Sequence, residues 1–191
     1  VLALIQQLSL KAPMIIGHSM GGKTVMQLLS MAPETLSKAI IVDIAPIAYT
    51  HHHEPMLNFI STLNLSQFQT RSSLDSELSK EINSPMVRNF VLKNIKRNEN
   101  GFYWQVNLEA ILKAYPGIMK AVLSELKKPI AVPSLFIAGQ RSDYIPLHVH
   151  DTIKKQFSTV SINTIANAGH WVQAEQADAF FEASYQFLKE A

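Results

Sequence analysis

The feature that most constrains the fold of this chain is the segment Gly17-His18-Ser19-Met20-Gly21. It follows a short apolar run over 13–17, typical of a buried strand, and precedes apolar residues at helical spacing. A serine between two glycines at a strand-to-helix turn fits the G-x-S-x-G pattern, in which the serine backbone is strained. We expect Gly17 and Gly21 to relieve crowding at this turn, and Ser19 to project its hydroxyl above the sheet.

Strands and helices are predicted to alternate at both ends of the chain but not in its middle. Apolar runs predict strands at 13–17, 38–44, 134–139 and 160–165, with helices near 1–9, 22–33, 147–156 and 177–188. This alternation indicates an α/β fold with a mostly parallel sheet flanked by helices. We expect 1–50 and 126–191 to form its core.

The middle of the chain, 51–125, is predicted to be a helical insertion. Its apolar residues lie at helical spacing in four short segments, 55–64, 73–82, 85–96 and 107–114. Ser84 precedes Pro85 as a helix N-cap would. A turn at 98–101 and a short strand over 102–106 interrupt the helices.

Composition excludes several classes of protein. The 191 residues contain no cysteine, which excludes disulfides, thiolate metal sites and a cysteine nucleophile, and which fits a cytoplasmic location. The net charge is only +2 and the basic residues are scattered, so we expect no nucleic-acid partner. No apolar run reaches the roughly 20 residues that span a bilayer, and we expect no membrane partner.

A serine nucleophile needs a base, and His170 is the candidate. The histidine follows the last predicted strand and precedes the last helix, in the segment Ala168-Gly169-His170-Trp171. A loop there can carry the imidazole across the top of the sheet to Ser19. Serine, acid and then histidine is also one of the chain orders in which catalytic triads occur.

Two aspartates are candidates for the acid that orients His170. Asp143, the first candidate, follows the strand that ends at Gly139, in a loop that neighbours the histidine loop. Asp43, the second, ends the strand after the nucleophile helix and would lie at the same edge of the sheet. The residues alone leave the choice between them open.

Other polar and aromatic residues have weaker predicted roles. The backbone N–H of Met20 at the helix N-terminus can stabilise an oxyanion. Tyr103, Tyr144 and Trp171 are candidates for substrate contacts. We predict no metal and no organic cofactor: adjacent residues in the run His51-His52-His53 point apart, and a polar entry to the insertion explains the run better.

The segment Gly17-His18-Ser19-Met20-Gly21-Gly22-Lys23 resembles the nucleophile elbow of α/β-hydrolases, and the chain is similar more narrowly to YbfF-type bacterial esterases. Three further stretches agree, namely 42–46, 135–139 and 168–175. The resemblance implies hydrolysis of carboxylic esters or acyl thioesters, including acyl-CoA, without a cofactor. It implies that the insertion is a cap, and that Asp43 can serve the triad where the later loop offers only serine. Here that loop has both Ser142 and Asp143.

The resemblance also implies that this sequence is the C-terminal part of such a fold. A full member has about four more strands, with a His-Gly segment that completes the oxyanion hole. Losing one oxyanion donor costs about 3–4 kcal/mol, so we expect the 191 residues alone to be nearly inactive. We expect a preceding segment or a second chain to complete the sheet.

Other functions remain compatible with these residues. The same fold and triad serve carbon–carbon bond hydrolysis, lyase and peroxidase chemistry, because a fold does not determine a reaction. A non-catalytic hydrolase-like binding protein is a further alternative, but it would normally have lost a member of the triad, and each member has a candidate here.

Overall fold

The computed structural model describes residues 1–50 and 53–190 and divides the chain into two compact units. The first unit contains Val1–Ala48 and Ala121–Ala191, and the second contains Tyr49–Lys120. The second unit is thus an insertion in the first, with boundaries at 48/49 and 120/121 where the sequence indicated 50/51 and 125/126. His51 and His52 of the predicted polar entry lie outside the described residues.

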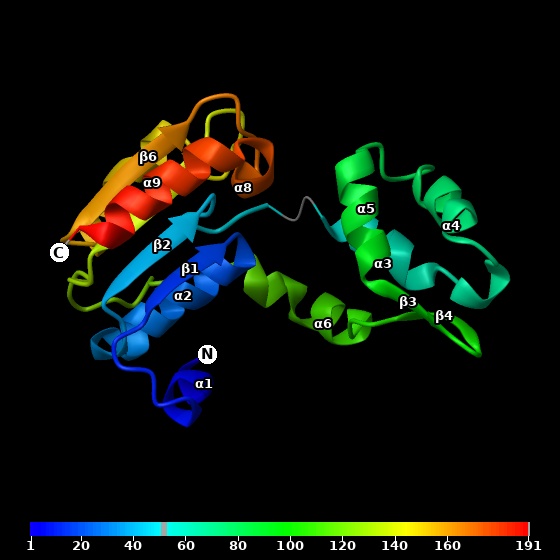
Figure 1. Ribbon diagram of the computed structural model, residues 1–191, viewed down its shortest axis with the longest axis horizontal. Coiled ribbons are helices and arrows are strands. Elements are labelled where there is room, and N and C mark those ends of the chain that lie inside the picture. The colour runs from blue at the N-terminus through cyan, green and yellow to red at the C-terminus, as the bar shows by residue number, and fades with distance from the viewer. Residues whose placement is uncertain (51–52, 191) are drawn as a thin grey trace. The chain divides into compact units, whose positions relative to one another are not determined.

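A parallel sheet of four strands forms the centre of the first unit (Figure 1). Its strands are β1 (Met14–His18), β2 (Lys38–Val42), β5 (Ser134–Gly139) and β6 (Val160–Ile165), in the spatial order β1-β2-β5-β6. Every pairing is parallel; for example, His18 lies opposite Val42, and Gly139 opposite Ile165. Because the strands are parallel, their carboxyl ends share one edge of the sheet.

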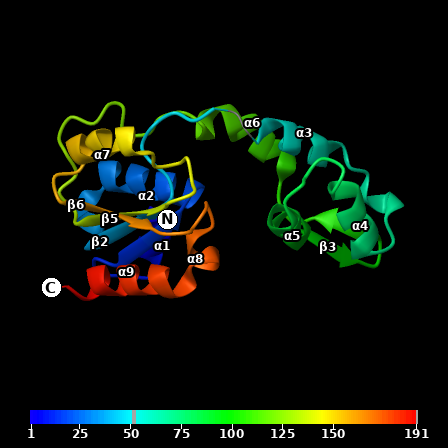
Figure 2. The same cartoon turned by 90° about the horizontal axis from the view of Figure 1, so that it is seen from above.

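Helices cover both faces of this sheet (Figure 2). On one face lie α2 (Met20–Met31) and α7 (His150–Gln156), the latter preceded by the short 3-10 helix η3 (Leu147–Val149). On the other lies α9 (Ala177–Lys189), preceded by α8 (Val172–Glu175). The chain begins with α1 (Leu2–Gln7), and the 3-10 helix η1 (Pro33–Thr35) follows α2.

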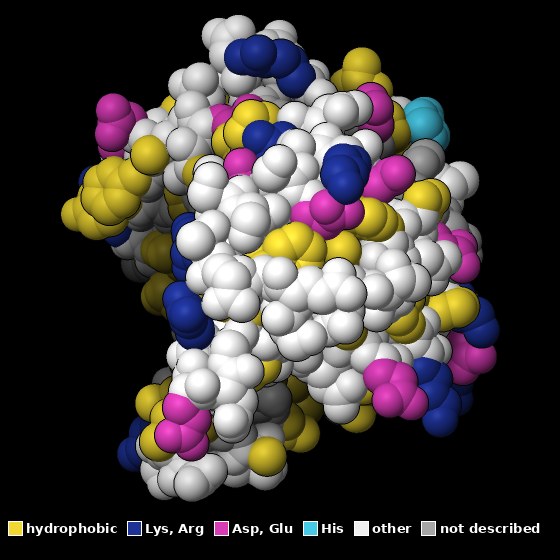
Figure 3. All heavy atoms as spheres, turned by 90° about the vertical axis from the view of Figure 1, so that its right-hand side faces the viewer, with side chains coloured by type: hydrophobic (Ala, Val, Ile, Leu, Met, Phe, Trp, Pro, Cys, Tyr) yellow, Lys and Arg dark blue, Asp and Glu magenta, His cyan; other side chains and the backbone are white. Residues whose placement is uncertain are grey.

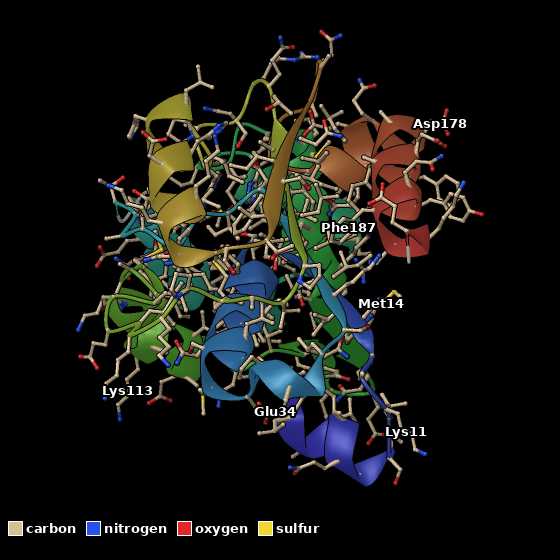
Figure 4. All side chains as sticks on the ribbon, turned by 90° about the vertical axis from the view of Figure 1, so that its left-hand side faces the viewer. Lys11, Met14, Glu34, Lys113, Asp178 and Phe187 are labelled. Carbon is tan, nitrogen blue, oxygen red and sulfur yellow. The ribbon has the colours of Figure 1, made fainter. Side chains whose placement is uncertain are left out.

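The core of the first unit follows from the apolar runs of the sequence. Strands β2 and β5 are buried on both faces, as expected for central parallel strands, and Ile40, Ile41, Phe136 and Ile137 are completely buried. Phe180 and Phe187 of α9 pack against one face. Figure 4 shows Phe187 between α9 and the strands and Asp178 on the outer side.

The second unit has a separate core and mixed secondary structure. It contains α3 (Glu54–Thr62), η2 (Leu65–Gln67), α4 (Arg71–Leu78), α5 (Pro85–Lys93), β3 (Ile95–Asn98), β4 (Gly101–Trp104) and α6 (Leu108–Ile118). Leu74, Leu78 and Ile95 are completely buried in its centre. The insertion is therefore not purely helical, because β3 and β4 form an antiparallel hairpin.

Most predicted elements are present, with some shifted bounds. Ser84 caps α5 through its hydroxyl, which accepts from Val87 N, and Pro85 is the first helical residue, as predicted. The segment predicted as one helix over 85–96 ends at Lys93, and β3 begins at Ile95. Within the described residues, no helix is both long and apolar enough to cross a membrane. Figure 3 shows Lys and Arg side chains interspersed with Asp and Glu on the face in view.

Candidate active site

Ser19 lies at the sharp turn between β1 and α2, as the sequence predicted. Its φ of 54° and ψ of −119° fall in a region that L-residues rarely adopt. Ser19 N donates to Val42 O at 2.9 Å, so the pairing of β1 with β2 continues to the point where the backbone bends. The neighbouring strand thus holds the strained serine at the carboxyl edge of the sheet.

Of the two glycines predicted to relieve crowding at this turn, Gly17 does so and Gly21 does not. A Cβ on Gly17 would lie 2.5 Å from Gly21 O, and a Cβ on Gly22 would lie 2.4 Å from Cγ2 of Ile44. A Cβ on Gly21 would meet no atom within 4 Å among the described residues. The expectation that Gly21 relieves crowding is therefore wrong for this structure, and Gly22 has that role because α2 packs closely on β2.

The imidazole of His170 lies between Ser19 and a buried carboxylate. Its Nε2 is 3.0 Å from Ser19 Oγ, and its Nδ1 is 2.7 Å from Asp43 Oδ2. The ring nitrogens therefore contact a hydroxyl on one side and a carboxylate on the other. A proton on Nδ1, donated to Asp43, leaves Nε2 free to accept the serine proton.

Asp43 is completely buried at the end of β2 and accepts three hydrogen bonds. Besides the contact with His170, Gly139 N donates to its Oδ1 at 3.0 Å, and the Ser142 hydroxyl donates to its Oδ2. A buried carboxylate without partners would be costly, and these donors compensate for lost hydration. Asp43 also has a positive φ, 49°, and its N–H donates to Ile137 O at 2.8 Å.

Of the two aspartates that the sequence offered, the structure places Asp43 and not Asp143, the first candidate, against the imidazole. The loop after β5 turns Ser142 toward the carboxylate of Asp43, while the side chain of Asp143 is exposed to solvent. Of these two adjacent residues, Ser142 is the one whose side chain contacts Asp43, through its hydroxyl.

Two of the predicted substrate contacts surround the imidazole. The ring of Tyr144 stacks on that of His170 at a centroid distance of 4.1 Å and an interplanar angle of 24°. The indole of Trp171 lies 6.5 Å from the same ring, at 81°. Tyr103 lies on β4 in the second unit with an exposed side chain, and its predicted role is untested.

Met20 begins α2 directly after Ser19, where the first N–H groups of a helix have no partner within the helix. Its backbone N–H is therefore available at the helix N-terminus, its predicted oxyanion role stays a prediction, and its side chain is exposed. Nearby in the same helix, burial lowers the pKa of Lys23. Among the described residues, no three His, Asp or Glu side chains are placed to hold a metal ion.

Ser142, His18 and Glu175 lie near His170, but the sequence predicted no function for any of the three. Ser142 was considered only as the residue beside Asp143, and His18 and Glu175 only as parts of longer segments. The position of His18 next to Ser19 in the G-x-S-x-G pattern is the sequence feature that could have indicated a role for it.

Burial lowers the pKa of His18, and the nearby His170 lowers it further. The hydrogen bond to the His170 backbone and the Asp43 carboxylate oppose this shift.

The fold and the site define a class of protein. The sequence profile of the α/β hydrolase fold family matches residues 1–177, and the chain belongs to this family. The nucleophile elbow, the parallel sheet and the histidine loop of this structure are the elements expected of it.

Several of the proteins to which the chain is similar are named as esterases or lipases. The chain is 34% identical over 176 residues to esterase YbfF of Escherichia coli, covering 92% of this chain and 66% of that protein. It is 30% identical to the mouse sn-1-specific diacylglycerol lipase ABHD11, covering 97% of this chain and 62% of that protein. The chain thus spans less than two thirds of the length of these relatives.

A solved structure described as a marine microorganism esterase matches the chain with a TM-score of 0.93 and 34% identity. The match covers 97% of this chain and 73% of that one. At this level of similarity the two share both fold and a substantial part of their sequence.

Proposed function

We propose that this chain carries the catalytic triad of a serine hydrolase that cleaves carboxylic esters, with Ser19 as nucleophile, His170 as general base and Asp43 as the acid. The observation that carries the proposal is the continuous contact from Ser19 Oγ to His170 Nε2 and from His170 Nδ1 to Asp43. The esterase and lipase names of its relatives support an ester as the substrate.

The geometry supports an acyl-enzyme mechanism in two steps. His170 Nε2 takes the proton of Ser19 as Oγ attacks the ester carbonyl, and the same proton then passes to the departing alcohol. Asp43 holds the proton on Nδ1 and stabilises the imidazolium. Water then attacks the acyl-enzyme, giving up its proton to His170, and the acid leaves as Ser19 Oγ regains a proton.

The N-terminus of α2 would stabilise the charge that develops on the carbonyl oxygen. The N–H of Met20 is adjacent to Ser19 in the chain, and the helix contributes partial positive charge at this end. One such donor typically contributes about 3–4 kcal/mol to transition-state stabilisation.

The substrate class within this proposal is an acyl ester, with acyl thioesters such as acyl-CoA as the second choice. The aromatic rings of Tyr144 and Trp171 beside His170 would contact the bound acyl chain or the leaving group. The second unit would act as the cap over the substrate, with Tyr103 as a candidate contact. No cofactor enters the mechanism, and the cytoplasmic location expected from the sequence stays a prediction.

Hydrolysis assays on the purified protein at its natural full length, and not on the 191 residues alone, test the proposal. We expect p-nitrophenyl butyrate to be cleaved, and Ser19→Ala to lower the rate by about a millionfold, toward the uncatalysed rate. Ser161→Ala, a change at an exposed serine of β6, should leave the rate unaltered.

Two comparisons make the result specific. Acyl-CoA thioesters and a vinylogous diketone, assayed in parallel, separate thioester and carbon–carbon bond hydrolysis from ester hydrolysis. Turnover that survives Ser19→Ala would refute the nucleophile. A folded wild-type protein that does not react with a fluorophosphonate would favour a non-catalytic binding protein instead.

A further inference from the structure

The carboxylate of Glu175 accepts hydrogen bonds from the backbone on both sides of His170. The N–H groups of the two residues that flank the histidine donate to different oxygens of Glu175: Gly169 N to Oε2 at 2.8 Å, and Trp171 N to Oε1 at 3.1 Å. The carboxylate is close-packed on this turn, since a Cβ on Gly169 would lie 2.9 Å from Glu175 Oε1. Hydrogen bonds to an ionised acceptor are stronger than neutral ones.

A second side chain holds the carbonyl group of the same residue. His18 Nε2 lies 2.8 Å from His170 O, and because a carbonyl only accepts, Nε2 must carry the proton. The two imidazole rings lie 4.7 Å apart at an angle of 42°. His18 belongs to β1, directly before Ser19, so this bond ties the histidine loop to the strand that carries the serine.

We propose that Glu175 and His18 are positioning residues that clamp the backbone on both sides of His170 and so hold its imidazole within reach of Ser19. Glu175 fixes the two N–H groups around the histidine, and His18 fixes its carbonyl. The loop over 166–171 has no regular secondary structure, and these contacts supply the constraint that a helix or strand would otherwise give. The inference rests on the proposed hydrolase function.

The clamp has a chemical consequence because proton transfer depends steeply on distance. Misplacing a catalytic group by about 1 Å can cost about a hundredfold in rate. Neither Glu175 nor His18 needs to touch the substrate, so the loss should fall on kcat and leave KM nearly unaltered. Glutamine at 175 keeps one acceptor oxygen but turns an NH₂ group toward a backbone N–H, so it should retain only part of the clamp.

The test uses the full protein with Glu175→Ala and Glu175→Gln, and with Glu182→Gln of the exposed face of α9 as a matched control. We expect kcat and the rate of fluorophosphonate labelling to fall about a hundredfold in the alanine variant and about tenfold in the glutamine variant. KM should vary by less than about twofold, and the control should match wild type. His18→Leu should lower kcat about tenfold. His18→Gln, which keeps a donor in place of Nε2, should retain most of the wild-type kcat.

A proton spectrum separates positioning from a general loss of stability. The Nδ1–H of His170, bonded to Asp43, should give a far-downfield resonance in wild type and in Glu182→Gln. It should be lost or broadened in Glu175→Ala while the rest of the folded spectrum persists. If that variant does not fold, the glutamine variant decides.

The outcomes distinguish this proposal from the proposed function. Labelling of Glu175→Ala and of His18→Leu at the wild-type rate would overturn the clamp and leave the hydrolase assignment intact. A wild-type protein that is not labelled at Ser19 would instead overturn the function on which the clamp rests.

Discussion

At the scale of single residues, the site depends on two strained backbones at the ends of neighbouring strands. Ser19 and Asp43 both have positive φ values, 54° and 49°, and each such residue costs on the order of 1–3 kcal/mol. Each is held by a backbone hydrogen bond from its own N–H to the carbonyl of the adjacent strand. This backbone conformation directs the two side chains toward His170, whose ring nitrogens contact both of them.

The acid can be identified by exchanging each aspartate for asparagine. Asp43→Asn should lower kcat by about 10³–10⁴-fold, because the amide no longer holds the proton on His170 Nδ1. Asp143→Asn, at an exposed side chain, should alter kcat by less than about twofold, as surface changes usually do. Steady-state kinetics on both variants measures this, and a larger loss at Asp143 would reverse the assignment.

His18 predicts a dependence of stability on pH. Burial and the nearby His170 lower its pKa, against the opposing effect of the His170 carbonyl and Asp43, so the unfolded chain takes up this proton first on acidification. The stabilising contribution is complete above the ordinary value of about 6.5 and is lost as the pH falls through the folded pKa. Denaturant unfolding between pH 5 and 8 should show that the free energy of unfolding of His18→Gln depends less steeply on pH than that of the wild type. An equal slope would mean that His18 is not the group responsible.

At the scale of elements, the turn from β1 to α2 is possible because one helix and two strands approach each other very closely at glycine residues. The helix α2 lies against β1 and β2 at Gly17 and Gly22, where a Cβ would meet backbone or Ile44. Gly139 has a similar role at the end of β5, since a Cβ there would lie 2.2 Å from Gly169 O of the histidine loop. These close approaches bring the carboxyl ends of the strands together around His170.

Alanine substitutions separate the required glycine from the tolerant one. Gly17→Ala should lower the free energy of unfolding by about 1–3 kcal/mol or more, because its Cβ would collide with Gly21 O. Gly21→Ala meets open space among the described residues outside its own helix, so it should not lower the free energy of unfolding and can raise it by up to about 1 kcal/mol. Equilibrium unfolding measures both. Equal losses would show that the close approach at Gly17 is not what limits the turn.

The sequence predicted the elements of the first unit well because each has a strong local signal. Apolar β-branched runs marked β2 and β5, and the pattern around Ser19 marked the elbow. The choice of acid could not be read in this way, because Asp43 and Asp143 both follow strands that end at the same edge. Which of them faces His170 depends on the direction of one turn, which places Ser142 inward.

Contacts between side chains and distant backbone groups could not be predicted from the sequence either. Glu175 and His18 contact the backbone of His170, and no residue pattern indicates which main-chain groups lack partners. The hairpin of β3 and β4 was partly missed because Ile95 continues the helical spacing of α5, whereas the helix ends at Lys93 and Ile95 pairs with Trp104.

At the scale of the whole molecule, each of the two units buries hydrophobic residues of its own among the described part of the chain. Ile137 is completely buried against α9 in the first, and Leu78 is completely buried in the second. All three residues of the proposed triad lie in the first unit. Stability of the second unit should therefore matter less for the chemistry of Ser19 than stability of the first.

Core truncations test this independence. Both Leu78→Ala and Ile137→Ala should cost about 2–5 kcal/mol in their own unit. Hydrogen exchange resolved by segment should show loss of protection in Tyr49–Lys120 for the first variant and around the sheet for the second. Labelling of Ser19 by a small fluorophosphonate should persist only in Leu78→Ala. Simultaneous loss of protection in both units would contradict two separate cores.

The most direct test of the central claim is to trap the acyl-enzyme. The protein at its natural full length is mixed with p-nitrophenyl acetate, quenched in acid within the first turnover, digested, and examined by mass spectrometry. The account predicts one acetyl group on the peptide that contains Ser19, at a level that falls sharply in His170→Ala. Hydrolysis without an adduct on that peptide, or an adduct on another residue, would contradict it.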